Sequence, residues 1–174
     1  MDDMNYPIFY ILDSSFFFGT QQIPDSTLDI YITTQEILDE IRDRTNQLRI
    51  DFLIESKKLS ILKGSKENEE EIKIQLASYS NLLRLSRADL SLLVLAETLK
   101  KENPDNNYVI WTDDYEIQNI AKILNITFKP IKTKGIKRIY KYILVCKACK
   151  SKIHPGESNC ENCGSNKFLR IKVK

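Results

Sequence analysis

The chain has 174 residues, 42% of them hydrophobic, so it can bury one core and carry a small appendage, but hardly two full domains. Residues 1–128 carry 13 Lys/Arg and 22 Asp/Glu, a net −9, whereas residues 129–174 carry 13 and 2, a net +11. This asymmetry predicts a body that holds a cation and a tail that either binds a polyanion or is simply solvated.

The sequence also lacks the marks of a membrane or secreted protein. No apolar run approaches the ~20 residues of a membrane span, and the start Met1-Asp2-Asp3 lacks the basic residues of a signal peptide. We therefore expect a soluble, cytoplasmic protein.

Strand-like and helix-like segments alternate along the first 131 residues. The predicted strands are 8–12, 29–33, 59–62, 108–112 and 126–131. The predicted helices are 35–49 behind a threonine cap, with one or two further turns over 50–56, then 66–85, 86–101 and 115–124. The first strand lacks in/out alternation, so both of its faces should be covered. This order predicts a three-layer α/β/α domain with a central parallel sheet and right-handed crossovers.

The composition changes after residue 131. A basic stretch over 132–142 precedes four cysteines, so the predicted division is an α/β domain at 1–131, a linker at 132–142 and a small module at 143–174. The cysteines form two C-x-x-C pairs separated by ten residues: Cys146, Cys149, Cys160 and Cys163. Each pair can present two thiolates to one ion, which predicts a tetrahedral structural zinc site within a ribbon of two or three strands.

Two alternatives for the cysteines are less consistent with the sequence. Thioredoxin-like redox pairs would need a βαβ context that neither motif has, and disulfides are uncommon in cytosolic chains. His154 lies between the pairs, but four thiolates already saturate zinc.

A segment of roughly 30 residues cannot fold on its own hydrophobic core, and zinc supplies an apparent ~10–16 kcal/mol in small zinc peptides.

Acidic residues from four segments are expected at the carboxyl ends of the strands, where ligands bind in open α/β sheets. They are Asp13 after the first strand, Glu36 and Glu40 on one helix face, Asp89 in the first turn of its helix, and Asp113 and Asp114 after the strand YVIWT. Each has an ordinary structural explanation: Asp89 could complete a capping box with Ser86, Glu40 could lie on a solvated face, and Asp114 could cap the next helix.

Carboxylates crowded at ~4 Å repel by ~4 kcal/mol per pair at an effective dielectric near 20, so such a cluster needs a cation. Oxygen ligands with open water positions suit Mg²⁺ or Mn²⁺. Such an ion can bind a phosphodiester and lower the pKa of a bound water. The body contains no histidine to act as a general base, so the metal would have to generate the nucleophile.

The acids and their surroundings resemble those of PIN-domain ribonucleases. The phrases LDSSFF, EIRD, LSRADLSLLVLA and TDDYEIQN, followed by the two C-x-x-C pairs, resemble the NIN-one-binding protein family over nearly the whole chain. The family's members are endonucleases that cut precursor small-subunit ribosomal RNA to form its mature 3′ end. The short chain resembles an archaeal member, and the resemblance implies a PIN domain, a zinc ribbon and a KH-domain assembly partner.

Carried over by position, the resemblance implies catalytic roles for Asp13, Glu40, Asp89, Asp113 and Asp114. The metal-binding acids would be Asp13, Asp89 and one of the last pair, for which we favour Asp114 and keep Asp113 as an alternative. Glu36 is a weaker substitute for Glu40, and Ser14 and Thr112 would orient carboxylates by hydrogen bonds. The residues expected to contact RNA phosphates are Lys132, Lys134, Lys137, Arg138 and Lys141.

Three functions are compatible with the sequence. The first is a Mg²⁺- or Mn²⁺-dependent endoribonuclease. The second is a non-catalytic RNA-binding adaptor of ribosome assembly, in which the acids are inert and Tyr140, Tyr142 and Phe168 either stack on unpaired bases or pack the ribbon core. The third is a receiver-type phosphoacceptor domain, which would need an aspartate after the third strand, where LSILKG offers none.

Overall fold

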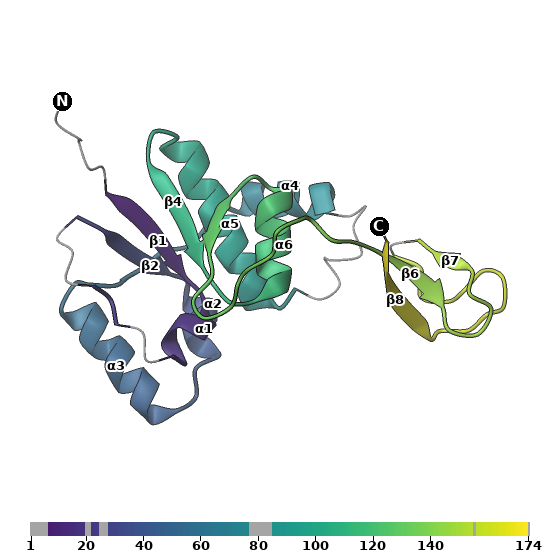
Figure 1. Cartoon of the computed structure of the whole chain (residues 1–174), viewed down its shortest axis with the longest axis horizontal. Helices are drawn as coiled ribbons and strands as arrows, with labels where there is room; N and C mark the ends of the chain where they lie inside the picture. The colour runs from purple at the N-terminus through teal and green to yellow at the C-terminus, as the bar shows by residue number, and fades with distance from the viewer. Residues whose placement is uncertain (1–6, 20–21, 25–27, 77–84, 155, 174) are drawn as a thin grey trace.

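The computed structural model describes residues 7–19, 22–24, 28–76, 85–154 and 156–173 of the chain. Five parallel strands form a sheet in the order β3-β2-β1-β4-β5, flanked by helices (Figure 1). The strands are β1 (Ile8–Leu12), β2 (Ile30–Thr33), β3 (Ser60–Ile61), β4 (Asn107–Trp111) and β5 (Thr127–Lys129). The predicted α/β fold with a central parallel sheet is confirmed.

The helices of this domain are α1 (Ser14–Phe17), α2 (Gln35–Asp39), α3 (Arg44–Glu55), α4 (Lys66–Leu76), α5 (Arg87–Glu102) and α6 (Tyr115–Ile123). None of the helices in the described ranges is long and apolar enough to cross a membrane. The predicted helix 66–85 corresponds to α4 as far as Leu76, and residues 77–84 lie outside the described part.

The single helix predicted over 35–49 is wrong, because the chain leaves the helix after Asp39 and starts a new one at Arg44. Asp43 causes the restart: its carboxylate accepts a hydrogen bond from the N–H of Asn46 at 2.9 Å and so caps α3. The Gln47 side chain also donates to the carbonyl of Ile41 at 2.9 Å, which fixes the intervening turn. The apolar spacing spans both helices, which is why the break was not predicted.

The core is centred on β1 and α5. Ile11 and Leu12 in β1 and Ile110 in β4 are fully buried, as are Leu92 and Leu93 in α5. α5 packs against β1 and β4 and also contacts α2, α4 and α6. These contacts fix the amino end of α5 close to the carboxyl ends of the two central strands.

The four cysteines belong to a second, antiparallel sheet in the order β7-β6-β8. Its strands are β6 (Lys141–Cys146), β7 (Lys152–Ile153) and β8 (Phe168–Val173), so β6 begins within the stretch predicted as linker. Figure 1 shows this small sheet beyond α6, joined to the larger domain by the segment that follows β5.

The order of the larger sheet determines where a ligand can bind. From β1 the chain moves outward to β2 and β3, then returns to the other side of β1 as β4 and continues to β5. The connections after β1 and β4 therefore leave in opposite directions and open a crevice at their carboxyl ends. Asp13 follows β1 and residues 112–114 follow β4, so both lie at this switch point.

Candidate functional site

Asp13 lies at the centre of the crevice, with only 3% of its surface exposed. Its Oδ1 accepts the N–H of Ser14 at 2.7 Å, and its Oδ2 accepts the hydroxyls of Ser15 and Thr112, each at 2.7 Å. The Ser14 hydroxyl is more distant, at 3.4 Å. Neutral donors on both oxygens hold the carboxylate in one orientation without neutralising its charge, which suits a ligand to a cation.

Thr112 connects Asp13 to Asp114. Its fully buried hydroxyl donates to Asp13 and accepts the N–H of Asp114 at 2.9 Å. Oδ1 of Asp114 caps α6 by accepting the N–H groups of Glu116 and Ile117, at 2.6 and 3.3 Å. Its second oxygen, Oδ2, accepts no hydrogen bond from the described residues.

In Asp89, as in Asp114, one carboxylate oxygen caps a helix and the other does not. Oδ2 completes a capping box by accepting the N–H of Ser86 at 2.8 Å, and Oδ1 has no hydrogen bond from the described residues. Burial raises the pKa of Asp89, its hydrogen bonds with Ser86 oppose the rise, and the carboxylates of Asp114 and Asp13 add to it. The capping role predicted as an alternative is thus real, and it leaves one oxygen free.

Glu40 follows α2 and belongs to the same electrostatic group. Burial raises its pKa, as do the carboxylates of Asp89 and Asp13, while the Ser86 hydroxyl opposes the rise. Burial and neighbouring negative charge thus disfavour the ionisation of Glu40 and Asp89, in a group that also holds Asp13 and Asp114. A cation held among them would relieve that repulsion, so this residue set fits a divalent ion.

Asp113 is held in a different environment from its neighbour. Its carboxylate accepts the N–H groups of Ile131, Lys132 and Thr133 and the hydroxyl of Thr133, at 2.9 to 3.0 Å. Burial opposes ionisation, but these hydrogen bonds prevail and lower the pKa of Asp113. Both oxygens are engaged by the chain that leaves β5, so this carboxylate fixes the start of the linker.

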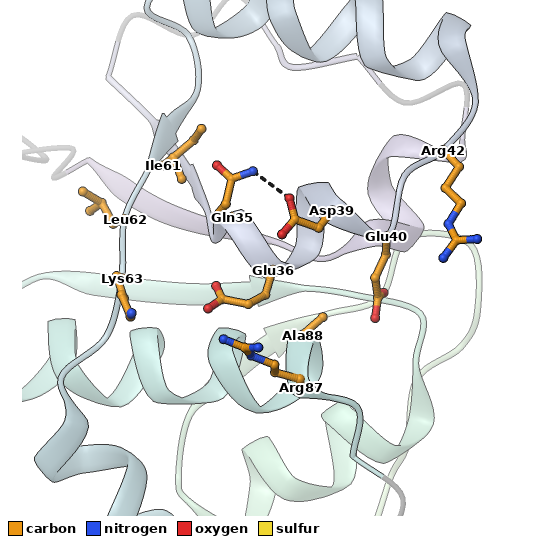
Figure 2. Close-up of a pocket in the computed structure, with 10 residues that line it drawn as sticks. All are labelled: Gln35, Glu36, Asp39, Glu40, Arg42, Ile61, Leu62, Lys63, Arg87 and Ala88. Carbon is orange, nitrogen blue, oxygen red and sulfur yellow. Dashed lines mark hydrogen bonds between the residues drawn. The ribbon is translucent and has the colours of Figure 1, made fainter.

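A groove of about 780 Å³ extends from Glu40 along the carboxyl ends of β2 and β3. Figure 2 shows Glu36 and Glu40 projecting from the α2 segment toward the start of α5. Three cations also line it, Arg42, Lys63 and Arg87, and none forms a hydrogen bond or ion pair with the described residues.

The position of Arg87 is unusual for a helix. It is the first residue of α5, where the positive end of the helix dipole disfavours a cation. The Lys73 side chain is the main cause that lowers the pKa of Glu69 in α4, and the charge of Arg87 adds to it, but no ion pair with the described residues holds Arg87 in place. A residue that breaks a local rule in this way is often placed for function. The sequence analysis missed Arg87, Arg42 and Ser15, and the basic residue directly after the Ser86 cap was the signal that could have revealed the first of them.

The cysteine sulfurs form a compact group at the end of the small sheet. Their four ligand atoms all lie within 4.8 Å of one another. No other group of three or more Cys, His, Asp or Glu among the described residues is as compact. The Sγ atoms of Cys146 and Cys163 are 3.4 Å apart and those of Cys149 and Cys160 are 3.5 Å apart. Sulfurs around tetrahedral zinc lie ~3.8 Å apart, given a Zn–S distance near 2.3 Å.

The protonation of these thiols also indicates a cation site. The Ser151 hydroxyl is the main cause that lowers the pKa of Cys149 to about 5. At Cys163 the N–H of Ser165 favours the thiolate, but hydrogen bonds with the Cys146 and Cys149 sulfurs prevail and raise the pKa of Cys163 to about 12. A positive charge between the sulfurs would favour the thiolate form of Cys163, and four-sulfur coordination of zinc would supply that charge.

The basic residues predicted to contact RNA are all exposed, on the linker and at the start of β6: Lys132, Lys134, Lys137, Arg138 and Lys141. The carbonyl of Lys137 accepts a hydrogen bond from the Lys122 side chain at 2.8 Å, which ties the linker to α6. The segment that carries them joins β5 to the small sheet and belongs to the part of the chain with the excess positive charge.

Comparison with known proteins connects this geometry to a family. Residues 10–99 match the family described as "PIN domain of ribonuclease". The chain is 36% identical over 157 residues to "Endoribonuclease Nob1" of Pyrococcus abyssi, covering 89% of each chain. It is 30% identical over 161 residues to "Endoribonuclease Nob1" of Archaeoglobus fulgidus, covering 92% of this chain and 90% of that protein.

Proposed function

This chain belongs to the family of archaeal Nob1 endoribonucleases, which carry a PIN domain, and we propose that it cuts precursor small-subunit ribosomal RNA to form the mature 3′ end. The observation that carries this proposal is the orientation of Asp13, which three neutral donors hold at the switch point beside three other carboxylates. A PIN nuclease needs such a group to hold divalent metal.

The metal-binding residues are Asp13, Asp89 and Asp114, with Glu40 positioning metal or water. Asp89 and Asp114 each use one oxygen to cap a helix and keep the other for the ion. Bound there, Mg²⁺ or Mn²⁺ would lower the pKa of a water ligand and stabilise charge on the leaving oxygen. Asp113 has a structural role in this assignment because its oxygens are engaged by residues 131–133.

The RNA lies along the groove that ends at Glu40. Arg42, Lys63 and Arg87 bind phosphates on one side of the cleaved bond, and the linker lysines bind the chain on the other side. Phosphate binding explains why the acidic body, at net −9, places three cations beside its carboxylates without an ion pair to any described residue. The groove is lined by residues of α2, the start of α5 and the segment that follows β3, and most of their side chains are exposed, which suits a flexible single strand.

The cysteine module holds one structural zinc ion through Cys146, Cys149, Cys160 and Cys163. With four sulfur ligands no coordination position remains for substrate, so this ion has no part in the chemistry. His154 has no place among these ligands, because four sulfurs already complete a tetrahedral site. The backbone N–H of His154 donates to the Glu157 side chain at 3.1 Å. The zinc-folded sheet and the linker supply RNA affinity, in the pre-small-subunit particle and with the KH-domain assembly factor that the family resemblance implies.

A cleavage assay tests the proposal. The substrate is a single-stranded RNA that spans the 3′ end of small-subunit ribosomal RNA, Mn²⁺ is added, and the position of the product's new end is mapped. We expect Asp13→Asn to reduce the single-turnover rate by at least about 100-fold, because it removes a charge from the metal site. Asp105→Asn, an exposed acid far from the crevice, is the matched control. Wild-type cleavage rates in Asp13→Asn would refute the mechanism, and RNA binding without cleavage under any divalent ion would favour the adaptor.

A further inference from the structure

The strongest additional feature is a pocket of about 320 Å³ where the large domain meets the small sheet. Its walls include three tyrosines, Tyr115 at the start of α6 and Tyr140 and Tyr142 at the start of the small sheet, together with Lys172 of β8. Its size is at the lower end of the ~300–1,000 Å³ typical of small-molecule sites. We propose that this pocket binds one unpaired nucleobase of the RNA substrate.

Contacts across the junction hold the pocket in place. Arg170 of β8 forms two hydrogen bonds with the carboxylate of Glu116 in α6, at 2.7 and 2.9 Å. Asn119 of α6 exchanges two hydrogen bonds with the backbone of Tyr140, at 2.7 and 2.8 Å. Because α6 and the small sheet are joined at these points, the aromatic walls are preorganised, and little ordering entropy remains to be lost on binding.

The side chains of β8 also fix two of the rings. The Lys172 ammonium lies 3.4 Å from the centre of the Tyr140 ring, and the Arg170 guanidinium lies 3.5 Å from that of Tyr142. Tyr115 differs, since it is 54% exposed and has no ring contact or hydrogen bond with the described residues. Its ring is the free aromatic surface of the pocket.

The chemistry of the walls favours a nucleobase over other ligands. Aromatic rings stack on any base, and an adjacent ammonium can bind the phosphate of the same nucleotide. Five of the eight residues that line the pocket belong to the part of the chain with net +11, which favours a polyanion, and the Glu116 carboxylate in its wall is paired with Arg170. Tyr115 directly follows Asp114, so a base on this ring belongs to a nucleotide close to the bond that the proposed nuclease cuts.

This inference rests on the proposed RNA substrate but not on cleavage, so a binding experiment without added divalent ions tests it. The substrate RNA is compared with a series of the same RNA, each member lacking one base. For the wild-type chain we expect one position whose missing base weakens binding about tenfold. Tyr115→Ala weakens binding of intact RNA by the same factor, and the two losses do not add, because the base and the ring are partners.

Two variants control this experiment. Tyr115→Phe keeps the ring and is expected to bind as the wild type does. Phe52→Ala removes another exposed ring, 63% exposed on α3 and far from the junction, and should leave binding unchanged. Zinc content and the unfolding midpoint establish that each variant is folded, which is expected for Tyr115 because its side chain is exposed.

The outcomes separate this inference from the proposed function. Three results would each overturn the proposal that the pocket binds a base: additive losses, a series without any sensitive position, or full affinity in Tyr115→Ala. A pocket that a protein partner fills instead would give one of these results. If the sensitive position is found and depends on Tyr115 while the wild-type chain cleaves no RNA with Mn²⁺, the pocket stands and the nuclease proposal fails.

Discussion

The hydroxyl oxygen of Thr112 lies 2.7 Å from Oδ2 of Asp13, although 99 residues separate the two in the sequence. The same hydroxyl accepts the N–H of Asp114, so one small side chain sets the positions of two proposed metal ligands. This contact spans β1 and β4, the strands on either side of the switch point. The geometry of the acidic group therefore depends on the pairing of these two strands.

Thr112→Val tests this relationship, since it removes the hydroxyl and keeps the shape. We expect cleavage to slow about 10- to 100-fold, the usual effect of losing a group that orients a metal ligand. The measurement is the single-turnover rate as a function of Mn²⁺ concentration, and a higher metal requirement is expected. Thr127→Val, on the exposed start of β5, is the control. An unchanged metal requirement in Thr112→Val would contradict the orienting role.

Asp113 and Asp114 are adjacent but should differ in what they control. Asp114→Asn retains the helix cap, since Asn caps about as well as Asp, and is expected to reduce cleavage by at least about 100-fold. In Asp113→Asn the amide NH2 takes the place of Oδ2 and meets the N–H of Lys132, and the hydrogen bonds to Oδ1 lose their charge, which should cost about 1–3 kcal/mol of stability. Urea unfolding and single-turnover cleavage of both variants measure the difference. The reverse pattern would assign the metal to Asp113.

The ion pair between Glu116 and Arg170 is the main polar contact between α6 and the small sheet. In Glu116→Gln the Arg170 guanidinium, whose side chain is only 10% exposed, loses its charged partner. We expect the junction to open more often, so that the amide of Tyr140, bound to Asn119 at 2.7 Å, exchanges its hydrogen several times faster. Glu102→Gln, at the exposed carboxyl end of α5, is the control. Equal exchange in the two variants would show that the pair does not hold the junction.

Zinc removal should separate binding from chemistry. Cys160→Ser removes a buried ligand and is expected to unfold the small sheet, because a module of this size has almost no core of its own. RNA affinity should fall about tenfold or more while the cleavage rate at saturating RNA changes much less. His154→Ala should keep its zinc and its affinity. A collapse of the saturated rate with unchanged affinity would refute this division of labour.

Much of the fold was predictable because the signals are local. The uninterrupted apolar strand before Asp13 indicated a sheet covered on both faces, and β1 is its central strand. Ser86 and Asp89 indicated the start of α5, where the capping box is present. The spacing of the four cysteines predicted their cluster. The helix over 35–49 failed for the same reason, since a local capping signal at Asp43 competed with an apolar period that continued through it.

The sequence by itself determined which elements form, where most of them begin and which residue types are available as ligands. Only the tertiary structure decided which oxygens remain free, because Asp113 is engaged by a segment that follows the next strand and Asp114 is not. It alone also placed Tyr115 against the small sheet and Arg87 beside the groove. Caps and periodicity arise within a few residues, whereas these contacts depend on strand order and on packing between segments far apart in the chain.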